Sequence, residues 1–144
     1  AEAVAVGDLD GDGKPDIVAG FYLTACVKVY HNTTVPGGTN RISFAAPLHY
    51  PTEARIHHVE IADVDGDGKP DIGFVAELES KMALFRNRSE PGRLTIDSFE
   101  AQVDFTSGWN ACGLAFGDLD GDGRVDIVFG NTYTNTVSVY RNIR

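Results

Sequence analysis

The chain has 144 residues, a hydrophobic content of 42% and a formal net charge of −9. This length fits one domain with a moderate core, and the negative charge argues against a nucleic-acid partner. No apolar run approaches the roughly 20 residues of a membrane span, and the N-terminus does not resemble a signal peptide, which a mature secreted chain would already have lost.

The first part of the chain, 1–55, contains four short stretches in which apolar residues occupy alternate positions. In chain order they are VAVGDL at 4–9, DIVAG at 16–20, CVKVYHN at 26–32 and ISFAAPLHY at 42–50. A period of two predicts β-strands, and no segment shows the apolar stripe of a helix. A turn-rich linker, NTTVPGGTNR, separates the last two stretches.

The same order of elements returns twice, at a constant interval along the chain. Ile17, Ile72 and Ile127 align without a gap, and an asparagine ends the third stretch of each unit. The repeats predict strands at 59–64, 71–75, 81–87 and 96–105, and then at 114–119, 126–130 and 136–142. We therefore expect one repeat domain, 1–144, built from units 1–55, 56–110 and 111–144.

Four-stranded antiparallel units with a period of about 40 to 60 residues are typical of the blades of a β-propeller. We predict an all-β fold of such blades, the last lacking its fourth strand; a stacked β-sandwich or an open β-array is the alternative. Closed propellers generally have four or more blades, so the chain is expected to be part of a larger or oligomeric propeller. Its last predicted strand, at 136–142, would be an open edge available for self-association.

An acidic loop lies between the first two strands of every unit: DLDGDGKPD at 8–16, DVDGDGKPD at 63–71 and DLDGDGRVD at 118–126. Carboxylates at loop positions 1, 3, 5 and 9 converge, and the position-7 carbonyl adds a further oxygen. Ca²⁺ prefers roughly 6 to 8 such ligands. The predicted ligands of three calcium sites are Asp8, Asp10, Asp12, Lys14 and Asp16; Asp63, Asp65, Asp67, Lys69 and Asp71; and Asp118, Asp120, Asp122, Arg124 and Asp126.

The loops also have interpretations other than calcium sites. Asx-turns without a metal would use the same residues, but three matching loops favour a metal. Mg²⁺ suits a flexible all-oxygen cage less well than Ca²⁺, and transition metals are disfavoured because the loops contain no His or Cys. An EF-hand would need a bidentate Glu at position 12, where Ala19, Phe74 and Phe129 stand instead.

The motifs GDLDGDGKPDIV at 7–18, ADVDGDGKPDIG at 62–73 and GDLDGDGRVDIV at 117–128 resemble the FG-GAP repeats of the integrin α-subunit propeller. They resemble even more the bacterial-type VCBS variant of that repeat. The resemblance covers essentially the whole chain and implies propeller blades with Ca²⁺ bound between their first two strands. It also implies an extracellular setting, in adhesion proteins, lectin-like proteins or accessory modules of carbohydrate-active enzymes. Val125, where the other loops have proline, is the one departure within the motif.

These features predict a secreted or cell-surface module, not an enzyme, in which calcium stabilises the scaffold. Its partner would be a protein or a glycan bound through loops between strands, and no motif identifies the ligand-binding residues. Two alternatives remain open. One is a structural unit that assembles into a ring or fibre through open blade edges. The other is a non-catalytic module of a secreted carbohydrate-active enzyme.

Several single residues add further hypotheses. Asn32 and Asn87 begin N-x-[ST] sequons and are candidate glycosylation sites. Cys26 and Cys112 form either one disulfide or two free thiols, because their spacing does not decide. The pair His57-His58 is expected to lie at the surface or to be packed, and Trp109 to pack or to stack on a sugar.

Overall fold

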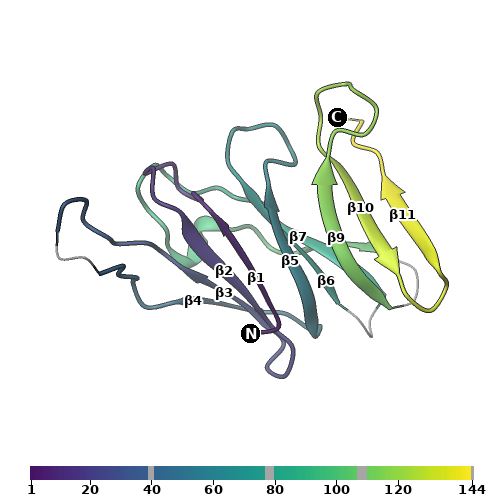
Figure 1. Cartoon of the computed structure of the whole chain (residues 1–144), viewed down its shortest axis with the longest axis horizontal. Helices are drawn as coiled ribbons and strands as arrows, with labels where there is room; N and C mark the ends of the chain where they lie inside the picture. Colours follow the sequence, from purple (N-terminus) through teal and green to yellow (C-terminus); the bar gives the residue numbers. More distant parts are fainter. Residues whose placement is uncertain (39–40, 77–79, 107–109, 144) are drawn as a thin grey trace.

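The computed structural model describes residues 1–38, 41–76, 80–106 and 110–143. These residues form three antiparallel sheets of four, four and three strands (Figure 1). The first sheet contains β1 (Ala3–Gly7), β2 (Asp16–Phe21), β3 (Cys26–Tyr30) and β4 (Leu48–Pro51). The second contains β5 (Ile56–Ala62), β6 (Asp71–Ala76), β7 (Lys81–Phe85) and β8 (Val103–Thr106), and the third contains β9 (Ala111–Gly117), β10 (Asp126–Asn131) and β11 (Thr136–Tyr140).

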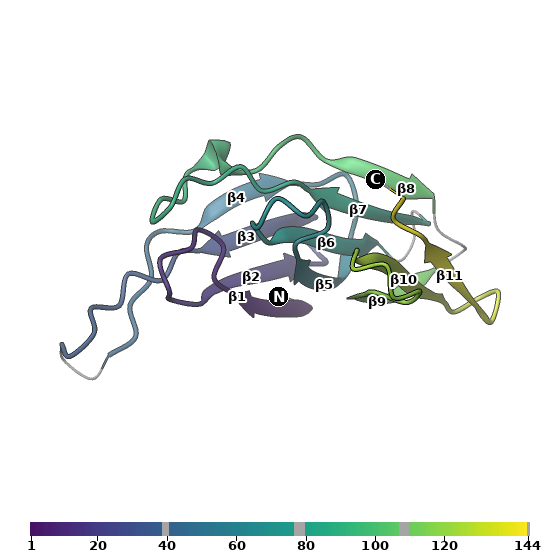
Figure 2. The same cartoon turned by 90° about the horizontal axis from the view of Figure 1, so that it is seen from above.

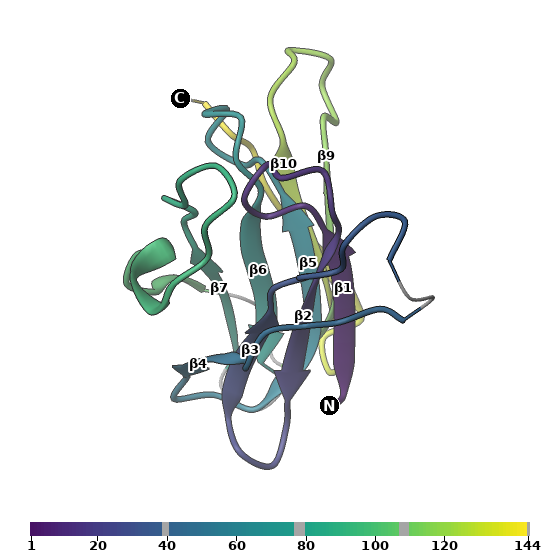
Figure 3. The same ribbon diagram turned by 90° about the vertical axis from the view of Figure 1, so that its left-hand side faces the viewer.

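The strands of each sheet follow one another in chain order, and each is hydrogen-bonded to the next. The first strands of the three sheets, β1, β5 and β9, lie along one side of the molecule, and β4 and β8 lie along the other (Figure 2). The three acidic loops project from the same end of the sheets (Figure 3). The predicted all-β fold of incomplete, propeller-like blades is confirmed.

The fourth strand of the first two units is shorter than predicted. Stretches 42–50 and 96–105 reduce to β4 and β8, while Phe44 and Phe99 form only isolated bridges to Asn32 and Asn87. In the first unit Pro47 has no backbone N–H to donate to the hydrogen bonds between strands, and β4 begins directly after it. In the second unit a capping box at Thr95 instead begins a short 3₁₀ helix, η1 (Ile96–Ser98).

Neighbouring sheets pack face to face through apolar side chains. Val18, Val27 and Val29 of the first sheet meet Ile56 and Val59 of the second in one buried cluster. A second cluster joins the next pair of sheets and includes residues from β6, β7, β9 and β10. Figure 1 shows the sheets side by side in this order. The core is therefore a pair of inter-sheet layers, because no single sheet can bury both of its faces.

Close approach between sheets depends on glycine. A Cβ atom at Gly20 would lie 2.3 Å from Cγ2 of Ile56, and one at Gly73 would lie 2.4 Å from Cζ of Phe116. Each glycine thus receives a large side chain from the following unit. The units therefore share a backbone arrangement, but different side chains fill the space above each glycine.

Gly73→Ala is expected to destabilise the chain by about 1 to 3 kcal/mol, because the added methyl group overpacks the ring of Phe116. Chemical denaturation measures this change. The matched control is Gly113→Ala on β9, where an added Cβ meets no atom within 4 Å. Equal losses in the two variants would contradict the interlocking packing.

Cys26 and Cys112 are unpaired, which resolves the alternative that their spacing left open. Cys26 is buried beside Thr24, whose Oγ1 lies 3.3 Å from the sulfur, whereas Cys112 is exposed on β9. Among the described residues, no helix has the length and apolar character needed to cross a membrane.

Candidate metal centres

Each acidic loop connects the first two strands of its sheet: β1 to β2, β5 to β6 and β9 to β10. We call them loop 1 (8–16), loop 2 (63–71) and loop 3 (118–126). Two glycines in each loop take positive φ angles, for example 71° at Gly11 and 83° at Gly13. These conformations are strained for other residues, and they curl the loop so that its carboxylates face inward.

The first aspartate of each loop organises the turn. Asp8 Oδ1 accepts hydrogen bonds from the backbone N–H groups of Gly11 (2.8 Å) and Asp12 (3.2 Å), and its Oδ2 accepts one from Gly13 (2.9 Å). Asp63 and Asp118 accept the equivalent three bonds in loops 2 and 3. The repeated phrase therefore folds into one repeated conformation.

The last aspartate fastens the loop to the sheet. Asp16 is buried; its Oδ2 accepts from the N–H of Leu9 (3.0 Å), and its Oδ1 accepts from that of Asn32 (2.8 Å). Asp71 and Asp126 do the same in their own units. Burial raises the pKa of Asp71 to about 6 and also raises the pKa of Asp16. Burial thus disfavours the ionised form of these carboxylates, which a cation in the loop would stabilise.

In each loop, three of the four predicted carboxylate ligands lie close to one another. Carboxylate oxygens of Asp8, Asp10 and Asp16 lie within 4.8 Å of one another, as do those of Asp63, Asp65 and Asp71 and those of Asp118, Asp120 and Asp122. The remaining carboxylates lie in the same loops: Asp12 and Asp67 at position 5, and Asp126 at position 9. Each loop therefore offers at least three converging hard oxygen donors.

The position-7 residues have a second role that the sequence did not indicate. The ammonium group of Lys14 pairs with Asp12, and that hydrogen bond lowers the pKa of the carboxyl group. Arg124 likewise donates from Nη2 to Oδ2 of Asp122 (2.9 Å) and lowers the pKa of that carboxyl group. In loop 2, the backbone N–H of Lys69 donates to Asp67 (3.0 Å).

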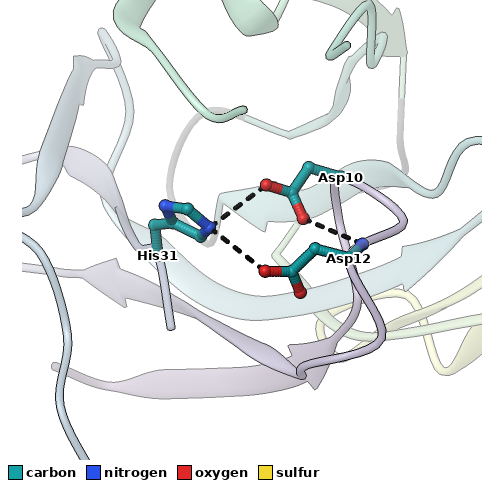
Figure 4. Close-up of side chains that lie close together, drawn as sticks. All are labelled: Asp10, Asp12 and His31. Carbon is teal, nitrogen blue, oxygen red and sulfur yellow. Dashed lines mark hydrogen bonds and ion pairs between the residues drawn. The ribbon is translucent and has the colours of Figure 1, made fainter. Parts of the chain in front are cut away.

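Sequence reasoning also missed a basic residue directly after the third strand of each unit. His31, Arg86 and Arg141 occupy the same position in the three units, so the repeat period could have revealed them. Arg86 pairs with Asp65 and Asp67, and Arg141 pairs with Asp120 and Asp122. Figure 4 shows the imidazole of His31 facing Asp10 and Asp12 in the same way.

The structure does not favour the predicted glycosylation of Asn32 and Asn87. Asn87 has no exposed surface, and its Nδ2 donates to the carbonyls of Leu9 (2.7 Å) and Pro70 (2.8 Å). Asn32 is also buried, with Nδ2 donating to the carbonyl of Pro15 (2.8 Å). A glycan on either nitrogen would disturb these hydrogen bonds. The asparagines fasten strand ends instead, as does Asn142 with the carbonyl of Val64 (2.7 Å).

The two remaining histidine candidates lie on β5 and have different neighbours. His57 and His58 are half-buried on β5; the His57 ring meets Tyr22 edge-on at 6.0 Å, and His58 Nε2 lies 3.4 Å from Glu60. Trp109 lies outside the described residues.

A family model described as FG-GAP-like repeat matches the chain twice, at residues 8–74 and 74–129. The first match begins at loop 1 and extends through loop 2 into β6, and the second continues through loop 3 into β10. No curated protein is similar enough to count as a match. The matched region thus contains all three acidic loops.

Proposed function

The chain belongs to the FG-GAP-like repeat family, and from this premise we propose that it is a calcium-stabilised module for extracellular recognition or adhesion. Ca²⁺ would bind in loops 1, 2 and 3 and stabilise the sheets. A protein or glycan would bind to residues that differ between the units. The module itself would catalyse no reaction.

One observation supports calcium most directly: each of the three loops brings three carboxylates together, from positions 1, 3 and 9 in loops 1 and 2 and from positions 1, 3 and 5 in loop 3. Such an arrangement of like charges is unfavourable unless a cation balances it. The donors in the loops are all oxygen, and Ca²⁺ tolerates an irregular, multidentate set of oxygen ligands better than Mg²⁺ does. Millimolar extracellular calcium would fill sites of micromolar affinity, which favours a secreted or surface location.

Isothermal titration of the metal-free chain with Ca²⁺ tests this proposal. We expect three calcium ions per chain, and two after Asp118→Asn, because this carboxylate both shapes loop 3 and contributes to its oxygen cluster. Mg²⁺ is expected to bind more weakly. Absence of calcium binding at millimolar concentration would overturn the proposal.

A screen of glycans and extracellular proteins, with calcium and with chelator, addresses the partner. Binding that requires calcium would support recognition by the calcium-ordered fold. An accessory role beside a secreted carbohydrate-active enzyme would appear in the same screen as binding to a polysaccharide.

A second candidate, self-association, is favoured by apolar side chains on the outer faces of the first and third sheets. Val4 and Val6 are 59% and 62% exposed, although their counterparts Val59 and Ile61 pack against the neighbouring sheet. Val137 and Val139 on β11 are similarly exposed, whereas Val27 and Val29 are fully buried. Each outer face therefore has the residue types that form the internal interfaces. Sedimentation of the full chain would give a monomer if this candidate is wrong.

A further inference from the structure

Loop 1 differs from the other two loops in the residue that faces it. His31 stands where loops 2 and 3 have Arg86 and Arg141. A guanidinium group has only N–H donors, whereas a neutral imidazole has a nitrogen lone pair and is the commonest protein ligand of metals. In the part of the chain that the structure describes, loop 1 pairs with Lys14 but not with an arginine, whereas loops 2 and 3 pair with Arg86 and Arg141.

Two buried atoms at this position lack a hydrogen bond among the residues that the structure describes. They are Oδ2 of Asp10 and Nε2 of His31. Asp10 is only 4% exposed, and its side chain has no contact with solvent. The two atoms lie 3.1 Å apart, but their alignment is not that of a hydrogen bond. A buried carboxylate oxygen thus faces an imidazole nitrogen without a hydrogen bond between them.

The spacing of the donors fits an ion between them. Nε2 of His31 lies 3.1 Å from Oδ2 of Asp10 and 3.8 Å from Oδ2 of Asp12. The donors around a tetrahedral zinc ion, at about 2.1 Å from each, are separated by about 3.4 Å. The two measured distances lie on either side of this value, and all three donor atoms lie within 4.8 Å of one another (Figure 4).

We propose that Asp10, Asp12 and His31 form a site for a divalent transition metal of the zinc class, present in the first unit alone. Imidazole and carboxylate donors together suit zinc, whereas Ca²⁺ takes oxygen ligands. The site does not depend on calcium binding to the loops. It shares the carboxylates of Asp10 and Asp12 with the calcium site proposed for loop 1, so the two ions compete there and not in loops 2 and 3.

Titration of the metal-free full chain with Zn²⁺, and with Co²⁺ as a spectroscopic probe, tests this site. We expect one tight equivalent of either ion per chain, with Co²⁺ giving visible absorption typical of nitrogen ligation. His31→Gln is expected to remove that absorption and to lower the zinc affinity by about 10- to 100-fold or more, since even an outer-shell change has this effect. Arg86→His is expected to create a second equivalent in loop 2.

His58→Gln is the matched control, because His58 also lies near a carboxylate, that of Glu60, at 3.4 Å. Unchanged zinc affinity in His31→Gln, or an equal loss in His58→Gln, would overturn the proposal. If His31→Gln does not fold, Arg86→His tests the proposal instead. A second equivalent of bound zinc supports the proposed site, and absence of a second equivalent refutes the proposal. Calcium stoichiometry of the same samples is measured separately, so failure of the calcium proposal is distinguishable from failure of this one.

Discussion

Calcium is expected to raise the midpoint of thermal unfolding by roughly 10 °C for each loop that it fills. An ion present at 100 times its dissociation constant adds about 2.7 kcal/mol to the free energy of unfolding. One kcal/mol corresponds to roughly 4 °C for a domain of this size. The loops fasten the ends of three strands through Asp16, Asp71 and Asp126, so ordering a loop stabilises its whole sheet. Calorimetric scans with millimolar calcium and with chelator measure the shift.

The shift should shrink by about a third in Asp63→Asn, which alters loop 2 and leaves loops 1 and 3 intact. Replacing calcium by sodium at equal ionic strength controls for general screening, which acts on exposed charges alike. Identical midpoints with calcium and with chelator would show that the loops are ordinary turns. In that case the backbone N–H groups bound by Asp8, Asp63 and Asp118 would suffice to hold them.

Asn87→Ala is expected to cost about 3 kcal/mol of stability, because it leaves buried hydrogen-bonding groups without a partner. Nδ2 of Asn87 donates to the carbonyls of Leu9 and Pro70, and its Oδ1 accepts from the N–H of Ser89 (2.8 Å). The bond to Leu9 joins the second unit to loop 1 of the first. Denaturant unfolding of the variant measures the loss.

Asn32→Ala is the matched comparison, since Asn32 holds the same position in the first unit. Within the described ranges of the chain, its side-chain amide bonds within that unit: Nδ2 donates to the carbonyl of Pro15, and Oδ1 accepts from the N–H of Thr34 (3.0 Å). We expect this change to cost about 1 to 2 kcal/mol. A cost as large as that of Asn87→Ala would mean that the link between units adds nothing.

The repeat explains why the sequence predicted so much of this fold. Alternating apolar residues and a constant repeat period located the strands of every sheet and the loops between them. The predictions at 42–50 and 96–105 were too long because Pro47 and the Thr95 capping box are local interruptions that override the alternation. Both lie outside the stretches that the units share most closely.

The misses at the candidate site have a different cause. His31, Arg86 and Arg141 are separated in the sequence from the loops that they face by two whole strands, and only strand pairing brings them close. Asn32 and Asn87 are predicted glycosylation sites because the three-residue sequon pattern takes no account of burial. In each case the decisive contact is long-range. The loop composition predicts calcium ligands, whereas tertiary structure determines which other side chains face the loops.

The bonds from Asn87 to Leu9 and from Asn142 to Val64 give the array a direction. The second unit donates a hydrogen bond to the first unit and accepts one from the third. The two faces of a unit are therefore different, so an interface made in this way is heterologous. Copies of the chain joined through such faces would have to run head to tail, as a closed ring or an open line, and a two-fold dimer cannot form through them.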